Sequence, residues 1–337
     1  MNKTCSISLA KNTEKLFSEF LKDDDINEIC YNGTDCIYIQ DYKGFWKEHK
    51  TKINLTQIEA FVTTLASYKN DVIGNKKPIL SATLNTGERV QVVVSPATKE
   101  NVISVTIRKP SKSKVSIEDF EKQGLFSEVV HNNIEISNPT VNELKKMFDK
   151  AQYKEFLSLA VKYGLNIVIA GSTGSGKTTL MKALIDFIPL EERIITIEDT
   201  EEIKFYEHKN FVQLFYPSEA KEGDLLNSAT LLKSCLRMKP DRILLAELRG
   251  AETYDFLNVV SSGHNGSITS CHAGSVKETF TRLALMILQN PQGQKLPFEI
   301  IQENLKNVID VVVHISNHNG KRRISEIYYK EVSNAHN

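Results

Sequence analysis

The feature that most constrains this chain is a glycine-rich stretch, residues 171–178, with the sequence Gly-Ser-Thr-Gly-Ser-Gly-Lys-Thr. An apolar run precedes it at residues 165–170, and residues 179–185 after it have the spacing of an amphipathic helix. A strand, a glycine-rich loop and a helix N-terminus together point successive backbone N–H groups at one anion. The pattern G-x-x-x-x-G-K-[ST] therefore predicts a phosphate-binding loop, called the P-loop below.

The residues of the P-loop have separate expected roles. Lys177 is expected against the β- and γ-phosphates of ATP, and the Thr178 hydroxyl is expected to bind a Mg²⁺ ion that bridges them. The nucleotide-binding residues predicted by the motif are Gly171, Ser172, Thr173, Gly174, Ser175, Gly176, Lys177, Thr178 and Thr179. A merely structural glycine turn is the alternative, which the flanking strand and helix patterns disfavour.

Composition limits the class of protein. The chain has 337 residues, enough for two domains, and its 42 basic residues balance 42 acidic ones, so nothing global indicates a nucleic-acid binder. No apolar stretch is long enough to span a membrane and no secretion signal is visible, which favours a cytoplasmic protein. The 5 cysteines form no C-x-x-C pair, so reduced, mostly buried thiols are expected.

The pattern of helices and strands divides the chain into two domains. Residues 1–110 are expected to form an α+β domain, with helices over residues 12–29 and 56–68, the second capped by Thr56. Residues 111–116 have the composition of a linker. The remainder, 117–337, is expected to be an α/β domain containing the P-loop.

In this second domain, apolar runs alternate with helical segments. The predicted strands beyond the P-loop are residues 193–197, 211–215, 242–246 and 266–270. Such alternation predicts a mostly parallel sheet covered on both faces, and ligands then bind at the carboxyl ends of the strands. The expected fold class is α/β: a C-terminal P-loop (RecA-like) domain preceded by a smaller α+β domain.

Titratable residues follow several of these strands. Glu198 begins an acidic cluster that ends at Glu202, and either could orient the attacking water or help to hold Mg²⁺, although an acidic helix start is an alternative. Glu247 ends an apolar strand in the manner of a Walker B carboxylate, and Arg249 could pair with phosphate or with a neighbouring acid. His272 lies in a Gly/Ser/Thr-rich frame where structural and functional roles are both open.

The order of these elements resembles the secretion ATPases, and most closely the VirB11-like ATPases of bacterial type IV secretion systems. The P-loop, the acidic box 196–202, the run 235–249 and the histidine box ending at 271–275 carry the resemblance. It extends through residues 29–33, 85–91 and 104–111 of the first domain. Departures are Ala246 in place of the usual glycine, Lys239 in place of arginine, and Ser270-Cys271 before the histidine.

The resemblance implies a hexameric ring of two-domain subunits with ATP between the domains. It implies Glu202 as the catalytic carboxylate, Glu247 as the Walker B acid, His272 as a sensor of the γ-phosphate, and Arg89 and Arg108 as arginines that reach the phosphates. From the residues alone, Glu198 and Glu202 are not distinguished, and Arg89 could be a solvated strand charge.

The function that the resemblance implies is Mg²⁺-dependent ATP hydrolysis that powers export and assembly of the apparatus at the cytoplasmic face of the inner membrane. Implied partners are other secretion components and an exported protein or DNA–protein substrate, without sequence-specific binding of nucleic acid. Alternatives are a type II secretion or pilus ATPase, a nucleotide-binding scaffold without turnover, and a nucleic-acid motor or kinase.

Overall fold

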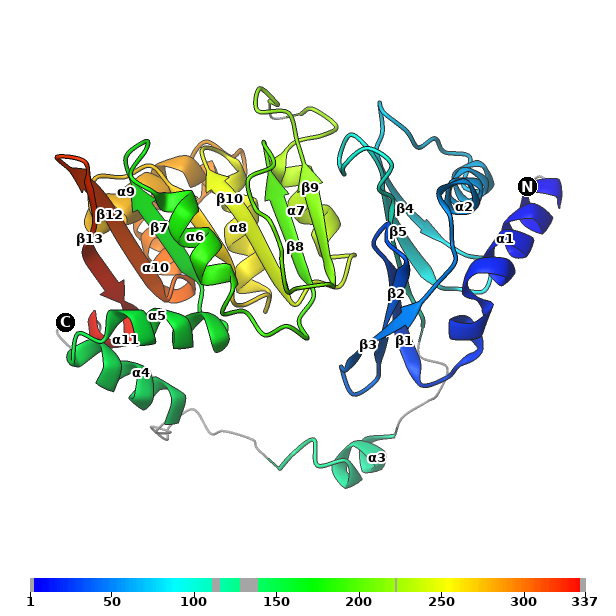
Figure 1. Ribbon diagram of the computed structural model, residues 1–337, viewed down its shortest axis with the longest axis horizontal. Helices are drawn as coiled ribbons and strands as arrows, with labels where there is room; N and C mark the ends of the chain where they lie inside the picture. Colours follow the sequence, from blue (N-terminus) through cyan, green and yellow to red (C-terminus); the bar gives the residue numbers. More distant parts are fainter. Residues whose placement is uncertain (1–2, 111–115, 128–138, 222, 334–337) are drawn as a thin grey trace.

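The computed structural model describes residues 3–110, 116–127, 139–221 and 223–333, and Figure 1 shows an α+β domain beside an α/β domain. The expected fold class is confirmed: an antiparallel sheet forms the first domain and a mostly parallel sheet forms the second. The linker expected at 111–116 lies almost wholly outside the described residues.

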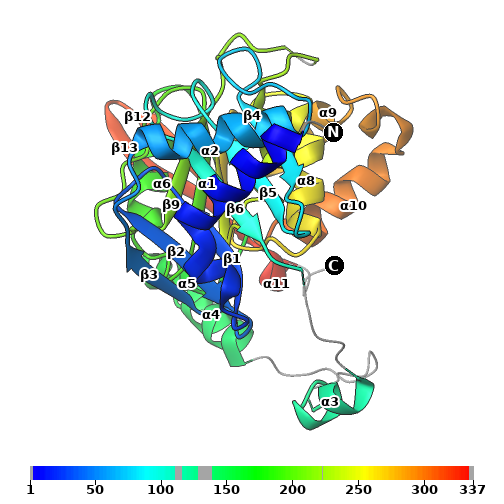
Figure 2. The same cartoon turned by 90° about the vertical axis from the view of Figure 1, so that its right-hand side faces the viewer.

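The N-terminal domain is built on a six-stranded sheet with the order β3-β2-β1-β6-β5-β4. Its strands are β1 (Ile26–Tyr31), β2 (Cys36–Asp41), β3 (Trp46–Lys50), β4 (Ile79–Thr83), β5 (Arg89–Val93) and β6 (Ser104–Arg108). Helices α1 (Lys3–Lys22) and α2 (Leu55–Tyr68) lie on the outer side of this sheet, facing the viewer in Figure 2. Phe17 and Phe61 join the two helices edge to face, with ring centroids 5.3 Å apart.

Two details of the sequence-predicted helices are wrong. The first helix ends at Lys22 rather than residue 29, because the Asp23 carboxylate accepts the Asp25 N–H at 2.9 Å and turns the chain into β1. The cap of α2 is Asn54 rather than Thr56. Asn54 accepts the Gln57 N–H at 3.0 Å and donates its own N–H to the Gln57 side chain at 3.0 Å, which is a capping box.

The C-terminal domain contains a seven-stranded sheet with the order β13-β12-β7-β11-β10-β8-β9. Its strands are β7 (Ile167–Gly171), β8 (Ile194–Glu198), β9 (Phe211–Phe215), β10 (Arg242–Leu248), β11 (Ile268–Cys271), β12 (Val311–His318) and β13 (Lys321–Tyr329). Every pair is parallel except the hairpin of β12 and β13. This hairpin was not predicted from the sequence.

Helices cover both faces of this sheet, as its continuous apolar strands require. Helices α4 (Pro139–Asp149), α5 (Tyr153–Lys162) and α6 (Lys177–Ile185) share one buried core. Helices α7 (Ser228–Cys235), α8 (Glu252–Ser261), α9 (Val276–Ile287) and α10 (Phe298–Val308) share the other. The short helices α3 (Ile117–Lys122) and α11 (Lys330–Ser333) and the 3-10 helix η1 (Gly293–Lys295) complete the described elements. Helix α3 lies apart from both sheets (Figure 1).

A buried arginine joins the two domains. Arg193 has no exposed surface, and its guanidinium donates to Asn32 of the first domain at 2.9 Å and to Asn210 at 2.6 Å. Val93 and Ala97 of the first domain belong to the same apolar core as α7 and β9. Because a buried charge is costly unless it is hydrogen-bonded, this contact favours one fixed arrangement of the domains.

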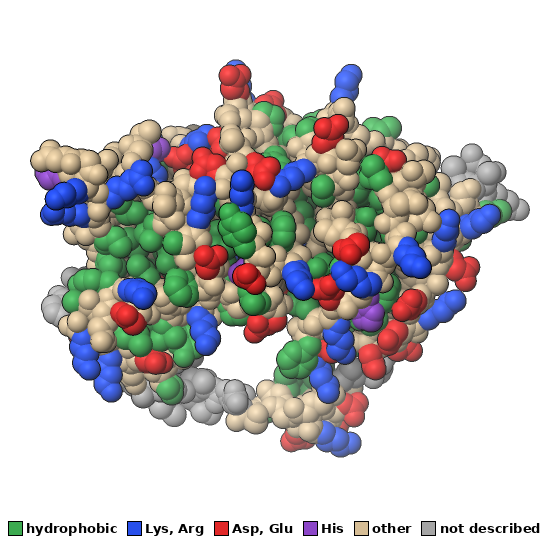
Figure 3. Space-filling model, viewed as in Figure 1, with side chains coloured by type: hydrophobic (Ala, Val, Ile, Leu, Met, Phe, Trp, Pro, Cys, Tyr) green, Lys and Arg blue, Asp and Glu red, His purple; other side chains and the backbone are tan. Residues whose placement is uncertain are grey.

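The surface is mixed in charge. Basic and acidic side chains are interspersed over the face in Figure 3, in keeping with the balance of charges in the sequence. None of the helices in the described ranges combines the length and apolar character needed to cross a bilayer. The cysteines in those ranges that can be assessed, Cys30, Cys36, Cys235 and Cys271, are buried free thiols, as expected.

Candidate active site

The P-loop connects the end of β7 to the start of α6, as predicted. Its lysine is turned back on the loop: Lys177 Nζ donates to the carbonyl oxygens of Gly171 and Ser172, each at 3.0 Å. Burial lowers the pKa of Lys177 because it disfavours the ammonium form. Of the other predicted binding residues, Ser175 is buried, Gly176 and Thr178 are half-buried, and Ser172, Thr173, Gly174 and Thr179 are exposed.

Two glycines are required by close approaches to the loop. At Gly171, with φ +156°, a side chain would begin 2.4 Å from the Ile315 carbonyl oxygen on β12. At Gly176, with φ +104°, it would meet the Arg322 side chain of β13 at 3.0 Å. A left-handed backbone and the absence of Cβ atoms therefore allow the loop to curl beside the β12–β13 hairpin.

The predicted residues after the other strands come together at the same edge of the sheet. Nδ1 of His272, just after β11, lies 3.3 Å from Lys177 Nζ, and His272 Nε2 lies 2.9 Å from Oε1 of Glu247 on β10. Because an ammonium group can only donate, Nδ1 accepts and the imidazole proton is assigned to Nε2, facing Glu247. Glu247 Oε2 in turn accepts from Arg249 Nε at 2.8 Å.

The network ends on a residue that the sequence analysis did not single out. Arg249 NH1 donates to Oδ2 of Asp199, directly after β8, at 2.7 Å. Lys177, His272, Glu247, Arg249 and Asp199 thus follow the sheet order β7-β11-β10-β8 along one edge. The position of Asp199 right after a predicted strand was the signal that could have identified it.

The two acids that the sequence left undistinguished occupy different environments. Glu198 is fully buried, and Oε2 accepts the N–H groups of Glu202 and Ile203, both at 2.9 Å. Its Oε1 accepts from Thr196 at 2.7 Å and from Gln213 at 3.2 Å. Since its oxygens are occupied by protein donors, Glu198 positions the following loop and is a poor candidate for a Mg²⁺ ligand.

The backbone N–H of Glu202 donates to Glu198 Oε2, while the Glu202 side chain is exposed to solvent. A free carboxylate at the carboxyl edge can accept a proton from water, which a buried and fully bonded one cannot do without losing hydrogen bonds. This difference favours Glu202 over Glu198 as the candidate base.

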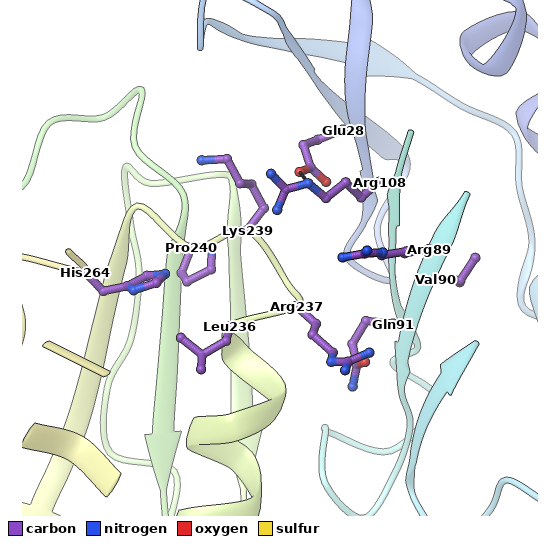
Figure 4. A pocket seen from close by; sticks show the side chains of 10 residues that line it. All are labelled: Glu28, Arg89, Val90, Gln91, Arg108, Leu236, Arg237, Lys239, Pro240 and His264. Carbon is purple, nitrogen blue, oxygen red and sulfur yellow. Dashed lines mark ion pairs between the residues drawn. The ribbon is translucent and has the colours of Figure 1, made fainter. Parts of the chain in front are cut away.

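The arginines of the first domain lie elsewhere. Figure 4 shows Arg89 and Arg108 pointing into a cavity of about 380 Å³ between the domains, opposite Arg237 and Lys239. Lys239 precedes β10, and His264 in the same cavity precedes β11, so the cavity lies at the amino edge of the parallel strands. The P-loop follows β7 and lies at the carboxyl edge. Within one chain, therefore, Arg89 and Arg108 lie away from the P-loop, and the expectation that they reach the phosphates stays a prediction.

The cavity also contains a buried acid. Glu28 on β1 is 1% exposed and pairs in register with Arg108 on the neighbouring strand β6, with Oε1 3.3 Å from Arg108 Nε. Desolvation raises the pKa of Glu28 to about 7, against the opposing influence of Arg108. One carboxyl group thus faces several cations, and the cavity retains an excess of positive charge.

A P-loop with carboxylates and a histidine at one edge of a parallel sheet defines a nucleotide hydrolase of the secretion ATPase class. The Type II/IV secretion system protein family matches residues 106–335. VirB11 of the Brucella abortus type IV secretion system is 49% identical over 315 residues, covering 92% of this chain and 87% of that protein. PtlH of Bordetella pertussis is 38% identical over 322 residues, covering 93% and 92%.

The fold agrees with these similarities. The crystal structure of the VirB11 ATPase from the Brucella suis type IV secretion system, in complex with sulphate, superposes with a TM-score of 0.91 at 45% identity. It covers 98% of this chain and 96% of that one. The chain belongs to the VirB11 family of type IV secretion ATPases and is an ATPase.

Proposed function

We propose that this ATPase works as a hexameric ring in which each nucleotide lies between the P-loop of one subunit and Arg89 and Arg108 of another. The observation that carries the proposal is the separation of these arginines from the P-loop of their own chain. The arginines face the amino edge of the seven-stranded sheet, whereas the P-loop lies at its carboxyl edge. A head-to-tail contact joins unlike surfaces, and its repetition closes into a ring when the rotation between neighbouring subunits is a whole fraction of a turn. The cationic cavity then receives the phosphates that the neighbouring subunit holds.

Mg²⁺ fits the residues at the carboxyl edge. Apart from its contact with His272, buried Glu247 Oε1 makes no hydrogen bond with the described residues, and the Thr178 hydroxyl lies in the first turn of α6. The described residues contain no cluster of three His, Cys, Asp or Glu side chains suited to a metal. Mg²⁺ at a P-loop does not need one, because phosphates and waters supply most of its ligands. Bound there, it would neutralise charge on the β- and γ-phosphates.

The residues of the chain would divide the reaction as follows. Lys177 leaves the carbonyl oxygens of Gly171 and Ser172 for the phosphates, Glu202 accepts a proton from the attacking water, and His272 responds to the γ-phosphate. Arg89 and Arg108 stabilise the charge that develops on the transferred group. Hydrolysis in this ring would power export of a protein or DNA–protein substrate, with the ring bound peripherally to other secretion components on the cytoplasmic face of the inner membrane.

The proposal is tested by mass and turnover together. Sedimentation with and without ATP is expected to detect a hexamer, and steady-state phosphate release is expected to require Mg²⁺. The Lys177→Ala variant is expected to lose turnover while remaining folded. A monomer under all conditions would remove the ring, and equal phosphate release by the variant would favour a docking scaffold instead.

A further inference from the structure

The β12–β13 hairpin extends beyond the sheet beside the P-loop. Ile315 of β12 pairs with Gly171, the last residue of β7, but β12 continues to His318. The far end of the hairpin therefore projects past the carboxyl edge, at the outer end of the sheet in Figure 1. Asn317 pairs with Arg322 in this projecting part.

Arg322 is the side chain of the hairpin that lies against the P-loop. A Cβ atom at Gly176 would be 3.0 Å from Arg322 Cδ, 3.4 Å from Nε and 3.6 Å from Cζ. Gly176 is the N-cap residue of α6, directly before Lys177. The guanidinium group thus lies beside the helix N-terminus that the motif dedicates to phosphate.

The electrostatics of this position are unfavourable without an anion. The N-terminus of a helix carries partial positive charge, and Lys177 adds a full one nearby. Within the described part of the chain, the Arg322 guanidinium has no hydrogen bond or ion pair, and its side chain is exposed. A cation held beside other positive charges gains most when a negative group binds among them.

We propose that Arg322 is a nucleotide-binding residue whose guanidinium contacts the α- and β-phosphates held by the P-loop. The backbone N–H groups of such loops cradle these two phosphates, whereas the lysine reaches the β- and γ-phosphates. Arginine suits this position because its planar fork donates two hydrogen bonds to one phosphate. The proposal rests on the assigned ATPase activity and is independent of the hexamer.

The consequence is a division between two sets of arginines. Arg322 acts on the part of the nucleotide that ATP and ADP share, so it contributes to retention of either one. Arg89 and Arg108 are proposed for the γ-phosphate and the charge that develops on it. Loss of Arg322 therefore weakens binding of both nucleotides by the same factor, whereas loss of the other arginines affects turnover.

The test is a calorimetric titration of ADP and of a non-hydrolysable ATP analogue into the full-length protein. Wild type is titrated first, so that a failure of nucleotide binding itself is separated from a failure of the Arg322 proposal. Arg322→Ala is expected to weaken both affinities about tenfold, with Arg322→Lys in between. Arg323→Ala is the matched control, because it removes the same charge from the next residue, which points to the other face of β13.

A second readout confirms that the variants are folded. The melting temperature without nucleotide is expected to be unchanged in Arg322→Ala, while the increase produced by a fixed ADP concentration becomes smaller. Unchanged or tighter ADP binding by Arg322→Ala would overturn the proposal. An equal loss of affinity in Arg323→Ala would also overturn it, because the effect would then come from the net charge of the hairpin and not from the position of Arg322. A loss of affinity confined to the ATP analogue would refute the assignment to the α- and β-phosphates.

Discussion

Nε2 of His272 lies 2.9 Å from Oε1 of Glu247, while the other nitrogen of the same ring lies 3.3 Å from Lys177 Nζ. One imidazole therefore joins the P-loop lysine to Glu247, the proposed Walker B carboxylate. In the proposed reaction Lys177 moves to bind phosphate and Nδ1 loses its donor, which would link the position of the lysine to the environment of Glu247. This contact would give His272 a physical route for the proposed response to the γ-phosphate.

Replacement of His272 by alanine is expected to separate turnover from binding. Without the imidazole ring, Glu247 loses one partner and the γ-phosphate loses its proposed sensor, so kcat should fall by about tenfold or more. ADP, which lacks the γ-phosphate, should bind with unchanged affinity. Phosphate-release kinetics and ADP titration on the same preparation check this, and a matching loss of ADP affinity would show that His272 only shapes the P-loop.

Sequence reasoning identified the carboxyl-edge residues because their signals are local. A buried strand followed by Glu247 or by the P-loop fixes where the side chain emerges, and parallel strands bring these ends together. The acidic box was harder, because position along the chain does not reveal that Glu198 is buried and accepts four hydrogen bonds. Only tertiary contacts distinguish it from exposed Glu202.

The missed hairpin had a readable signal. Asn319 and Gly320 both have positive φ, at 51° and 76°, which is the turn that an Asn-Gly pair favours between two strands. The nearness of Arg322 to Gly176 had no such signal, because 146 residues separate them in the chain. The placement of Arg89 and Arg108 also depends on how the domains pack, which no local pattern encodes.

Mixing two impaired variants tests whether the arginines act between subunits. Arg89→Ala is expected to reduce turnover about tenfold or more while leaving the fold intact, and Lys177→Ala removes the P-loop lysine. In a co-assembled ring, an Arg89→Ala subunit still has its lysine and can receive Arg89 from a Lys177→Ala neighbour. Equal mixing should restore up to about a quarter of the sites. No recovery after confirmed co-assembly would contradict the proposed arrangement.

The buried carboxyl group of Glu28 predicts a pH-dependent stability. Its pKa is about 7 in the folded protein against 4.5 when unperturbed, because desolvation disfavours the charge. The folded state therefore binds the Glu28 proton more tightly than the unfolded state does. The stability that this protonation contributes to the folded state is complete below about pH 4.5 and is lost as the pH rises through 7. The difference between the two pKa values corresponds to about 3 kcal/mol of stability.

Glu28→Gln should remove this dependence, because the amide cannot ionise. Melting temperatures of wild type and variant are measured between pH 5 and pH 8. The melting temperature of the variant is expected to rise relative to that of wild type as the pH increases, with the largest difference at pH 8. Parallel curves over this range would show that Glu28 does not titrate there.

The single tryptophan reports on the contact between the domains. Trp46 on β3 donates its indole N–H to Asp241 Oδ2 of the second domain at 2.7 Å, and the same oxygen accepts the Arg193 N–H at 2.8 Å. Asp241→Ala leaves both donors without this acceptor, at a cost of about 1–3 kcal/mol. Arg193 also donates to Asn32 of the first domain, so Asp241 and Arg193 belong to one contact between the domains. Loss of the Asp241 carboxylate should therefore separate the domains before either sheet unfolds.

Denaturation of Asp241→Ala should therefore be followed by two signals. The shift of Trp46 emission to longer wavelength should occur at a lower denaturant concentration than the loss of the far-ultraviolet circular dichroism signal. Asp35→Ala is the control, because Asp35 pairs with Lys50 at 3.0 Å on the exposed surface of the first domain and contributes little to stability. Coincident transitions in Asp241→Ala would mean that the apolar core shared by the two domains is sufficient to keep them together. In that case the Trp46–Asp241 hydrogen bond would contribute only to the general stability of the chain.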